Sequence, residues 1–130
     1  MDSIMYGIGR ELPEPFDTAL PRVVEALKAE GFGVITEIDV KKTMKEKLGV
    51  DVRPHNILGA CNPKLAHAAM EVEPDLGVLL PCNVDVYEVD GGTRVVAVNA
   101  GAMLGMVGNE QLQPIADEVG ARLGRVLESL

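Results

Sequence analysis

The chain has 130 residues and a net charge of −8, and 47% of its residues are hydrophobic. This length and composition predict a single globular domain with an ordinary core, and they exclude a disordered chain. Aromatic residues are scarce, with two Phe, two Tyr and no Trp, so the base-stacking platforms of many nucleic-acid-binding modules are missing. The net negative charge also repels phosphate backbones, and we therefore expect no nucleic-acid partner.

No targeting or membrane segment is predicted. The opening residues, MDSIMYGIGR, lack the apolar run of a secretory signal. No stretch approaches the roughly 20 apolar residues of a membrane span. We therefore expect a cytoplasmic protein with two reduced cysteines, although a structural disulfide remains possible on sequence grounds.

The first part of the chain predicts a strand, a helix and a second strand. Ile4 to Leu12 has strand character, and its Gly-x-Gly lacks the third glycine of a dinucleotide-binding fingerprint. Apolar residues at helical spacing predict a helix from about residue 17 to Glu30, with Pro21 in its first turn or at a kink. β-branched residues then predict a strand over Phe32 to Ile38.

Two short helices are predicted around a buried strand. Asp39 is a good N-cap for a helix over Val40 to Leu48, which Gly49 would end. Ile57 to Ala60 has the continuous apolar character of a buried strand. Asn62-Pro63 predicts the start of another helix, to about residue 71, because Asn caps helices and Pro suits their first position.

A hairpin is predicted next. Leu76 to Val89 is the longest predicted strand, and Pro81 interrupts it, which indicates an edge strand or a bulge. Beyond residue 80, side chains alternate: residues 82, 84, 86 and 88 are expected on one face, and residues 83, 85, 87 and 89 on the other. Asp90-Gly91-Gly92 predicts the hairpin turn, and Thr93 to Val98 the returning strand.

The last part predicts a connector and a long helix. Asn99 to Asn109 is glycine-rich and apolar, and within it Ala100 to Val107 is expected to be an interface or a mobile flap. Glu110 to Leu130 carries one apolar face at helical spacing. Five strands, two long helices and two short inserted helices predict an α+β sheet with helices on one face.

Two Cys-Asn pairs, Cys61-Asn62 and Cys82-Asn83, nominate a site. Cys61 is expected just before a helix, where the positive end of the dipole favours a thiolate, and Lys64 could add to this effect. The alternative is that both cysteines are small buried hydrophobes. We expect the two pairs to meet if their strands are parallel neighbours, and to lie apart if the strands are antiparallel or separated.

Positive charge gathers near these pairs. Six cations and two anions lie between Lys41 and Lys64, so this segment is +4 and the rest of the chain −12. The cluster indicates either a solvated helix face or a patch that attracts a small anion. In the leading hypothesis, a small anion binds at Cys61, Asn62, Lys64, Cys82 and Asn83, with Asn62 primarily a helix cap and Asn83 orienting the ligand.

Two other functions remain open. A thiol-based redox or sulfur-transfer enzyme would use Cys61 as nucleophile and Cys82 as its resolving or assisting partner. A structural or protein-interaction module would have no small-molecule site. Serine-nucleophile hydrolases are excluded, because the only serines, Ser3 and Ser129, are terminal, and no P-loop, HExxH or G-x-S-x-G motif occurs.

A metal site is not expected, and the sequence names no cofactor. His55, Cys61, His67 and Cys82 offer two nitrogens and two sulfurs, a set that suits zinc. Their spacing matches no zinc finger, however, and the chain contains no C-x-x-C pair.

Three blocks of sequence resemble a known family. They are GFGVITEIDVKKTMKEKLGV, then ILGACNP with LAHAAME, then GVLLPCNVDVYE. In this order they resemble domain-of-unknown-function family 302, over about Met5 to Ala121. The family pattern includes the positions of Cys61-Asn62-Pro63 and Cys82-Asn83, whereas His55 lies outside it.

The resemblance implies a fold and an assembly but no activity. It implies a TATA-binding-protein-like arrangement, β-α-β-β-β-β-α, which agrees with the element order predicted from the residues. It also implies a homodimer. No function is established for the family, so the resemblance assigns no catalytic residue.

Overall fold

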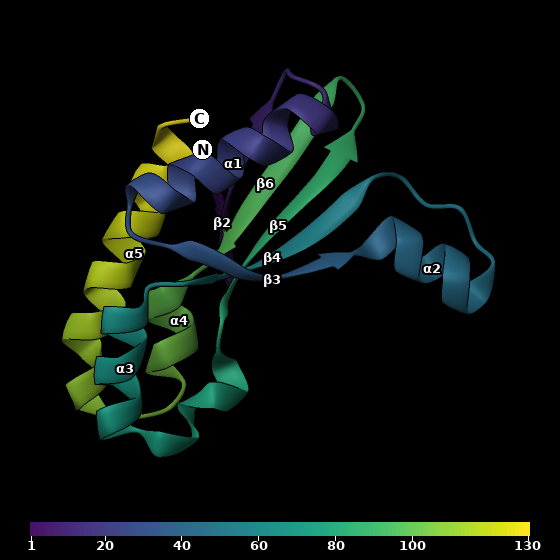
Figure 1. Ribbon diagram of the computed structural model, residues 1–130. Helices are drawn as coiled ribbons and strands as arrows, with labels where there is room; N and C mark the ends of the chain where they lie inside the picture. The colour runs from purple at the N-terminus through teal and green to yellow at the C-terminus, as the bar shows by residue number, and fades with distance from the viewer.

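Residues 1–130 are all described by the structure, a computed structural model, in which one sheet carries helices on one face (Figure 1). The six strands are antiparallel, in the order β1-β2-β6-β5-β4-β3. The strands are β1 (Asp2–Ile4), β2 (Gly7–Leu12), β3 (Gly33–Asp39), β4 (His55–Cys61), β5 (Cys82–Val89) and β6 (Gly92–Val98). The helices are α1 (Phe16–Ala29), α2 (Val40–Leu48), α3 (Pro63–Val72), η1 (Pro74–Leu79), α4 (Ala100–Gly105), η2 (Glu110–Leu112) and α5 (Gln113–Glu128). The predicted α+β class is confirmed.

The core lies between the sheet and the two long helices, α1 and α5. Seventeen buried residues form it, and the sheet contributes Leu58, Val84, Val86, Val95 and Ala97 among them. The helices contribute Ala19, Val23, Leu27, Val119, Leu123, Val126 and Leu127. Each fully buried Val or Leu contributes about 1.5–3 kcal/mol through removal of apolar surface from water. Because both long helices pack on the same side, the sheet has one buried face and one face that no helix covers (Figure 1).

The predicted local signals for α1, α2 and α3 are largely confirmed. Asp39 accepts a hydrogen bond from the Lys42 amide at 2.9 Å, and Gly49 ends α2 with a φ of +68°. Asn62 Oδ1 accepts from the Leu65 amide at 3.2 Å and caps α3. In α1, Pro21 lies in the second turn, not in the first, because the helix begins at Phe16.

The predicted first strand is in fact a hairpin. Strands β1 and β2 pair antiparallel, with Asp2 opposite Gly9, so the sheet has six strands instead of five. The turn between them contains Met5 and Tyr6, and neither residue is typical of turns, so no local signal predicted it.

The predicted strand Leu76–Val89 is also divided. Its first part is the 3₁₀ helix η1, a cis peptide bond joins Leu80 to Pro81, and β5 begins only at Cys82. Proline has no amide hydrogen, so the regular ladder starts after it. The prediction of an edge strand or a bulge was wrong, because β5 is an inner strand between β4 and β6 and pairs with both in regular register. Beyond this point the alternation is as predicted: Cys82, Val84 and Val86 are buried against the helices, and the residues between them face the uncovered side.

The segment Ala100–Val107 is neither an irregular connector nor an exposed flap. Its first six residues form α4, capped by Asn99, whose side chain accepts from the Ala102 amide at 3.1 Å. Leu104 is buried and Met103 packs against the core, which leaves Met106 as the exposed methionine of this segment. Helix α4 thus belongs to a second apolar cluster, made of Ala69, Leu76, Leu104, Leu112 and Ala116.

Candidate functional site

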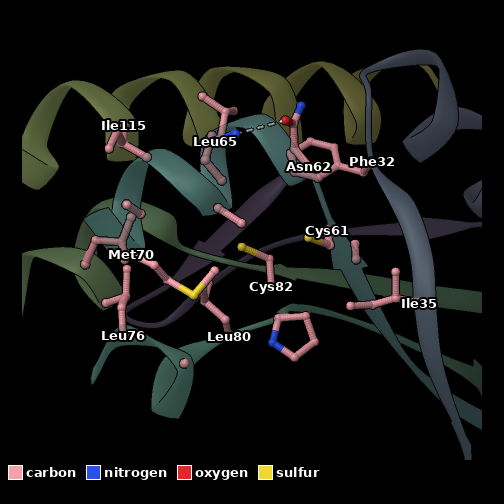
Figure 2. Close-up of a pocket in the computed structure, with 17 residues that line it drawn as sticks. Phe32, Ile35, Cys61, Asn62, Leu65, Met70, Leu76, Leu80, Cys82 and Ile115 are labelled. Carbon is pink, nitrogen blue, oxygen red and sulfur yellow. Dashed lines mark hydrogen bonds between the residues drawn. The ribbon is translucent and has the colours of Figure 1, made fainter. Parts of the chain in front are cut away.

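An apolar cavity of about 290 Å³ lies where the ends of β4 and β5 meet α3, η1, α4 and α5 (Figure 2). Fourteen of its 17 lining residues are hydrophobic, and none is charged. Its walls include Phe32, Leu65, Met70, Leu76, Leu80, Leu104 and Ile115. Both cysteines and Asn62 also line the cavity.

Antiparallel pairing brings the two cysteines together. Cys61 is the last residue of β4 and Cys82 is the first residue of β5, and Ala60 lies directly opposite Cys82. The sequence interpretation required parallel strands for the two pairs to meet, and it was wrong for the cysteines, because it did not foresee that β5 begins at Cys82. With Cys82 at the start of β5, antiparallel neighbours put both thiols at one end of the sheet.

The two thiols have different environments. Cys82 is 7% exposed, and burial raises its pKa to about 11, with a smaller contribution from the nearby Cys61. Cys61 is half-buried and lies directly before the N-cap of α3. Both cysteines are free thiols. At neutral pH Cys82 is therefore a protonated, apolar part of the wall, and Cys61 is the more accessible thiol.

Asn62 connects the cavity to the end of α1. A Cβ atom at Gly31 would lie 2.9 Å from Asn62 Nδ2 and 3.2 Å from Arg122 Nη1, so the chain passes very close to both side chains here. Gly31 also has a φ of +85°, which favours glycine. Asn62 thus caps α3, lines the cavity and packs against the turn at Glu30-Gly31, which follows α1.

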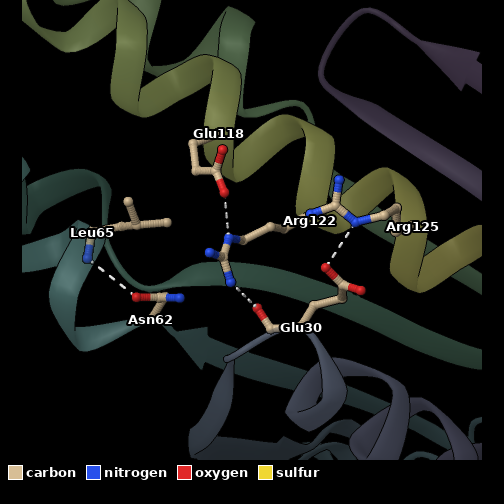
Figure 3. A network of polar contacts seen from close by, with 6 residues as sticks. All are labelled: Glu30, Asn62, Leu65, Glu118, Arg122 and Arg125. Atoms are coloured by element: carbon tan, nitrogen blue, oxygen red, sulfur yellow. Dashed lines mark hydrogen bonds and ion pairs between the residues drawn. The ribbon is translucent and has the colours of Figure 1, made fainter.

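A polar network fixes this turn against α5 (Figure 3). Arg122 donates from Nη1 to the backbone carbonyl of Glu30 at 2.9 Å and from Nε to Glu118 at 2.7 Å. Arg125 Nε donates to Glu30 Oε1 at 2.9 Å. Since Glu30 lies two residues before Phe32, these contacts position a segment whose aromatic ring lines the cavity.

Two predicted site residues do not join the cavity. Lys64 is exposed and does not line it. Asn83 faces the uncovered side of the sheet, opposite to Cys82. Alternation along β5 separates the two residues of the Cys82-Asn83 pair, so the second Cys-Asn element does not act as a unit.

The predicted cationic neighbourhood is also absent from the cavity. Helix α2, with four of the six clustered cations, lies at the opposite end of the sheet from α3 and α4 (Figure 1). Arg53 is paired with Glu88 at 3.1 Å and with Asp90 at 2.9 Å, next to the β5–β6 turn. The structure therefore does not form the anion site that the charge pattern predicted around the cysteines.

The four possible zinc ligands are dispersed. His55 Nε2 lies 2.5 Å from Asp85 Oδ1 in a part-buried pair between β4 and β5. His67 is exposed on α3, with Nε2 3.2 Å from Glu71 Oε1. No three His, Cys, Asp or Glu side chains come close enough together to hold a metal ion.

Most of the cavity wall was not predictable as a site. Met70, Leu76, Leu104 and Ile115 come from four different helical elements, and each fits an ordinary apolar helix pattern. Only the tertiary packing of α3, η1, α4 and α5 leaves a space between them. The two cysteines and Asn62 were the part that local signals could nominate.

Comparisons with known proteins agree with the fold. The family model described as "Domain of unknown function DUF302" matches residues 8–130. A crystal structure of an uncharacterized conserved DUF302 protein from Bacillus stearothermophilus has a TM-score of 0.88 and 30% sequence identity. The match covers 96% of this chain and 98% of that one. The search of curated proteins gives no match.

The structure contains no helix with the length and apolar character needed to cross a bilayer. The resemblance carried by the three sequence blocks is confirmed by both the family match and the structural match. The chain belongs to DUF302, a family defined by a domain of unknown function.

Proposed function

We propose that the chain binds a small, neutral, largely apolar molecule in the cavity beside Cys61, Asn62 and Cys82. The observation that carries this proposal is the composition of the wall, which is apolar on nearly every side and contains no charged side chain. Burying a charge there without a partner would cost several kcal/mol, whereas apolar surface gains from leaving water. The volume lies at the lower end of small-molecule pockets, about 300 Å³.

Polar groups at the cavity can orient such a ligand. The Cys61 thiol is half-buried, and the Asn62 amide lies at the start of α3. A small number of polar groups in a mainly hydrophobic wall is typical of sites that fix the direction of a ligand. The ligand we propose therefore has an apolar body and one hydrogen-bonding end.

The test is a displacement assay with a neutral fluorescent probe, N-phenyl-1-naphthylamine. We expect the probe to brighten with the protein, and 1-octanol to displace it at a concentration at least tenfold lower than octanoate does. Ala66→Leu should weaken probe binding, because Ala66 lines the cavity. Ala121→Leu makes the same change at an exposed position of α5 and should bind normally.

Other results would point away from this function. Equal displacement by octanol and octanoate would contradict the preference for neutral ligands. Probe binding that Ala66→Leu leaves unchanged would place the probe elsewhere. If no probe binds at all, the structural or interaction module remains, and replacing either cysteine by serine should then change stability alone.

A second candidate, thiol-based redox chemistry, is favoured by the presence of both cysteines in the wall of one cavity. Cys61 adjoins the residue paired with Cys82, and strand geometry gives such diagonal neighbours a Cα separation of about 6 Å. Disulfides form at Cα separations below about 7 Å when the Cβ atoms also face each other, so this scheme requires the end of β4 to turn Cys61 towards Cys82. In this scheme the Cys61 thiolate attacks hydrogen peroxide, breaks its O–O bond and becomes a sulfenic acid, and the Cys82 sulfur then displaces water from it. Overall, two thiols and one peroxide give one disulfide and two waters.

Peroxide treatment tests this second function. Intact-mass measurement should show the loss of two hydrogens from the chain, and peptide mapping should join Cys61 to Cys82. The Cys82→Ser variant should stop at an oxidised Cys61 that reacts with dimedone, a trap for sulfenic acids. A Cys61 that peroxide oxidises no faster than free cysteine would exclude the redox function.

We also propose that the chain works as a cytoplasmic homodimer. Both cysteines are free thiols, and free thiols are typical of proteins in a reducing compartment such as the cytoplasm. Strand β3 is at the edge of the sheet, with one paired side, and it exposes Ile35 and Ile38. An unpaired edge with apolar side chains is suited to pairing with a second copy. Sedimentation at micromolar concentration should give a dimer, and Ile38→Lys should give a monomer.

A further inference from the structure

A second concavity, of about 490 Å³, lies on the uncovered face of the sheet over β5 and β6. Asn83, Asp85 and Tyr87 line it along β5, and Val96 lies opposite Asp85 on β6. It is separate from the apolar cavity, because the cavity opens among the helices, whereas these side chains point away from them. Tyr6 also lines this groove, so both tyrosines of a chain poor in aromatics contribute to it.

Two charged groups line the groove, and their surroundings differ. The Arg94 side chain is 16% exposed, and its two terminal nitrogens bind the two carboxylate oxygens of Asp2 at 2.8 and 2.9 Å. This bidentate pair neutralises the guanidinium within the chain. A Cβ atom at Gly9 would lie 2.5 Å from Arg94 Nη2, so a glycine at this position leaves the space that the arginine occupies.

Asp85 is the accessible charge. Its side chain is 38% exposed, and one oxygen lies 2.5 Å from His55 Nε2. The other carboxylate oxygen makes no hydrogen bond within the chain. A carboxylate has room for several donors, so Asp85 can accept from a ligand while His55 holds it in place.

We propose that this groove binds an organic ammonium ion with an aromatic or apolar body. The carboxylate of Asp85 would accept hydrogen bonds from the ammonium group, and such charged pairs are among the stronger hydrogen bonds. Tyr87 and Tyr6 line the groove, and aromatic rings attract cations and stack with other rings. The Tyr87 ring also lies 5.2 Å from the His55 ring, the partner of Asp85. Val96 supplies an apolar floor beside Asp85. The line of side chains along β5 favours an elongated molecule.

The test uses two probes of the same shape and opposite charge, 2-phenylethylamine and 3-phenylpropionate. The full chain is labelled with 3-fluorotyrosine and titrated while fluorine NMR is recorded. Because the chain has two tyrosines and both line the groove, every signal reports on this site and none on the apolar cavity. We expect saturable shifts with the amine and none with the carboxylate.

Two matched variants examine the role of the charge. Asp85→Asn keeps the size of the side chain and should weaken amine binding at least tenfold, the usual loss for a charged hydrogen bond. Asp75→Asn makes the same change at an exposed position of η1 and should leave the affinity unchanged. The pair of probes also gives a test in the unmutated chain, so the outcome does not depend on whether Asp85→Asn folds.

Three results would overturn the proposal. The first is equal shifts with the amine and the carboxylate, which would indicate contact with the aromatic ring alone. The second is an amine affinity that Asp85→Asn leaves unchanged. The third is a fluorine spectrum that changes with protein concentration but not with added amine. This result would mean that a second copy of the chain covers this face.

Discussion

Cys82 illustrates how burial controls the chemistry of a single side chain. The thiol is 7% exposed and its pKa is raised to about 11, mainly by burial and further by Cys61. The neighbouring Cys61 is half-buried and lies at a helix start. The sequence nominated both residues, but it could not rank them, because the Cys-Asn pairs look alike and burial is a tertiary property. The structure makes Cys61 the accessible thiol and Cys82 part of the wall.

The raised pKa of Cys82 predicts a loss of stability in alkaline solution. In the unfolded chain the thiol has its ordinary value of about 9, so between pH 9 and 11 the unfolded chain ionises while the folded chain retains the proton. The stabilising contribution of the neutral thiol is therefore complete below pH 9 and is lost as the pH rises towards 11. Two pKa units correspond to about 2–3 kcal/mol.

Urea unfolding of the wild type and of Cys82→Ala, at several values between pH 8 and 11, measures this contribution. The difference in unfolding free energy between the two proteins should shrink by about 2–3 kcal/mol over this range. Cys61→Ala keeps the buried thiol and should lose stability as the wild type does. A constant difference between wild type and Cys82→Ala would show that the thiol is not buried as the structure places it.

At the scale of elements, sequence signals succeeded where one residue type decides the local geometry. Asp39 and Asn62 were predicted as caps, and both accept the expected backbone hydrogen bonds. Asn99 and Asn109 cap α4 and η2 in the same way, but the glycine-rich segment between them obscured their helical context. The interruption at Pro81 was predicted, but the 3₁₀ helix before it was not, since its apolar residues suit a strand and a 3₁₀ helix equally.

The cap at Asn62 predicts a measurable loss of stability. Asn62→Ala removes the acceptor for the Leu65 amide, and loss of such a cap costs about 1 kcal/mol. Asn62→Asp retains an acceptor and should stay within a few tenths of a kcal/mol of wild type. Asn83→Ala is the matched control, because Asn83 is exposed in a strand and caps no helix. Equal losses for the two alanine variants in urea unfolding would contradict the cap.

On the scale of the whole molecule, contacts far apart in the sequence complete the site. Pairing of β4 with β5 brings both cysteines into the wall of one cavity, which closes where α3, η1, α4 and α5 converge. The Arg122 contact with Glu30 spans 92 positions. Local sequence patterns predicted the class of fold and most elements, but they do not show which surfaces of those elements pack together. The cavity and the groove on the other face were therefore visible only after folding.

The contact between Arg122 and the end of α1 gives a prediction at this scale. Arg122 is 32% exposed and donates to the Glu30 carbonyl, one of the last carbonyls near a helix end, which lack partners inside the helix. Arg122→Ala should therefore lower the unfolding free energy by about 1–2 kcal/mol. It should also weaken N-phenyl-1-naphthylamine binding, because the released turn leads to Phe32 in the cavity wall.

Arg125→Ala is the matched control. The Arg125 side chain is 52% exposed and makes a surface ion pair, so its loss should cost less than about 1 kcal/mol and leave probe binding unchanged. Urea unfolding and probe titration of both variants test this prediction. Equal losses of stability and of probe affinity in the two variants would contradict a positioning role for Arg122.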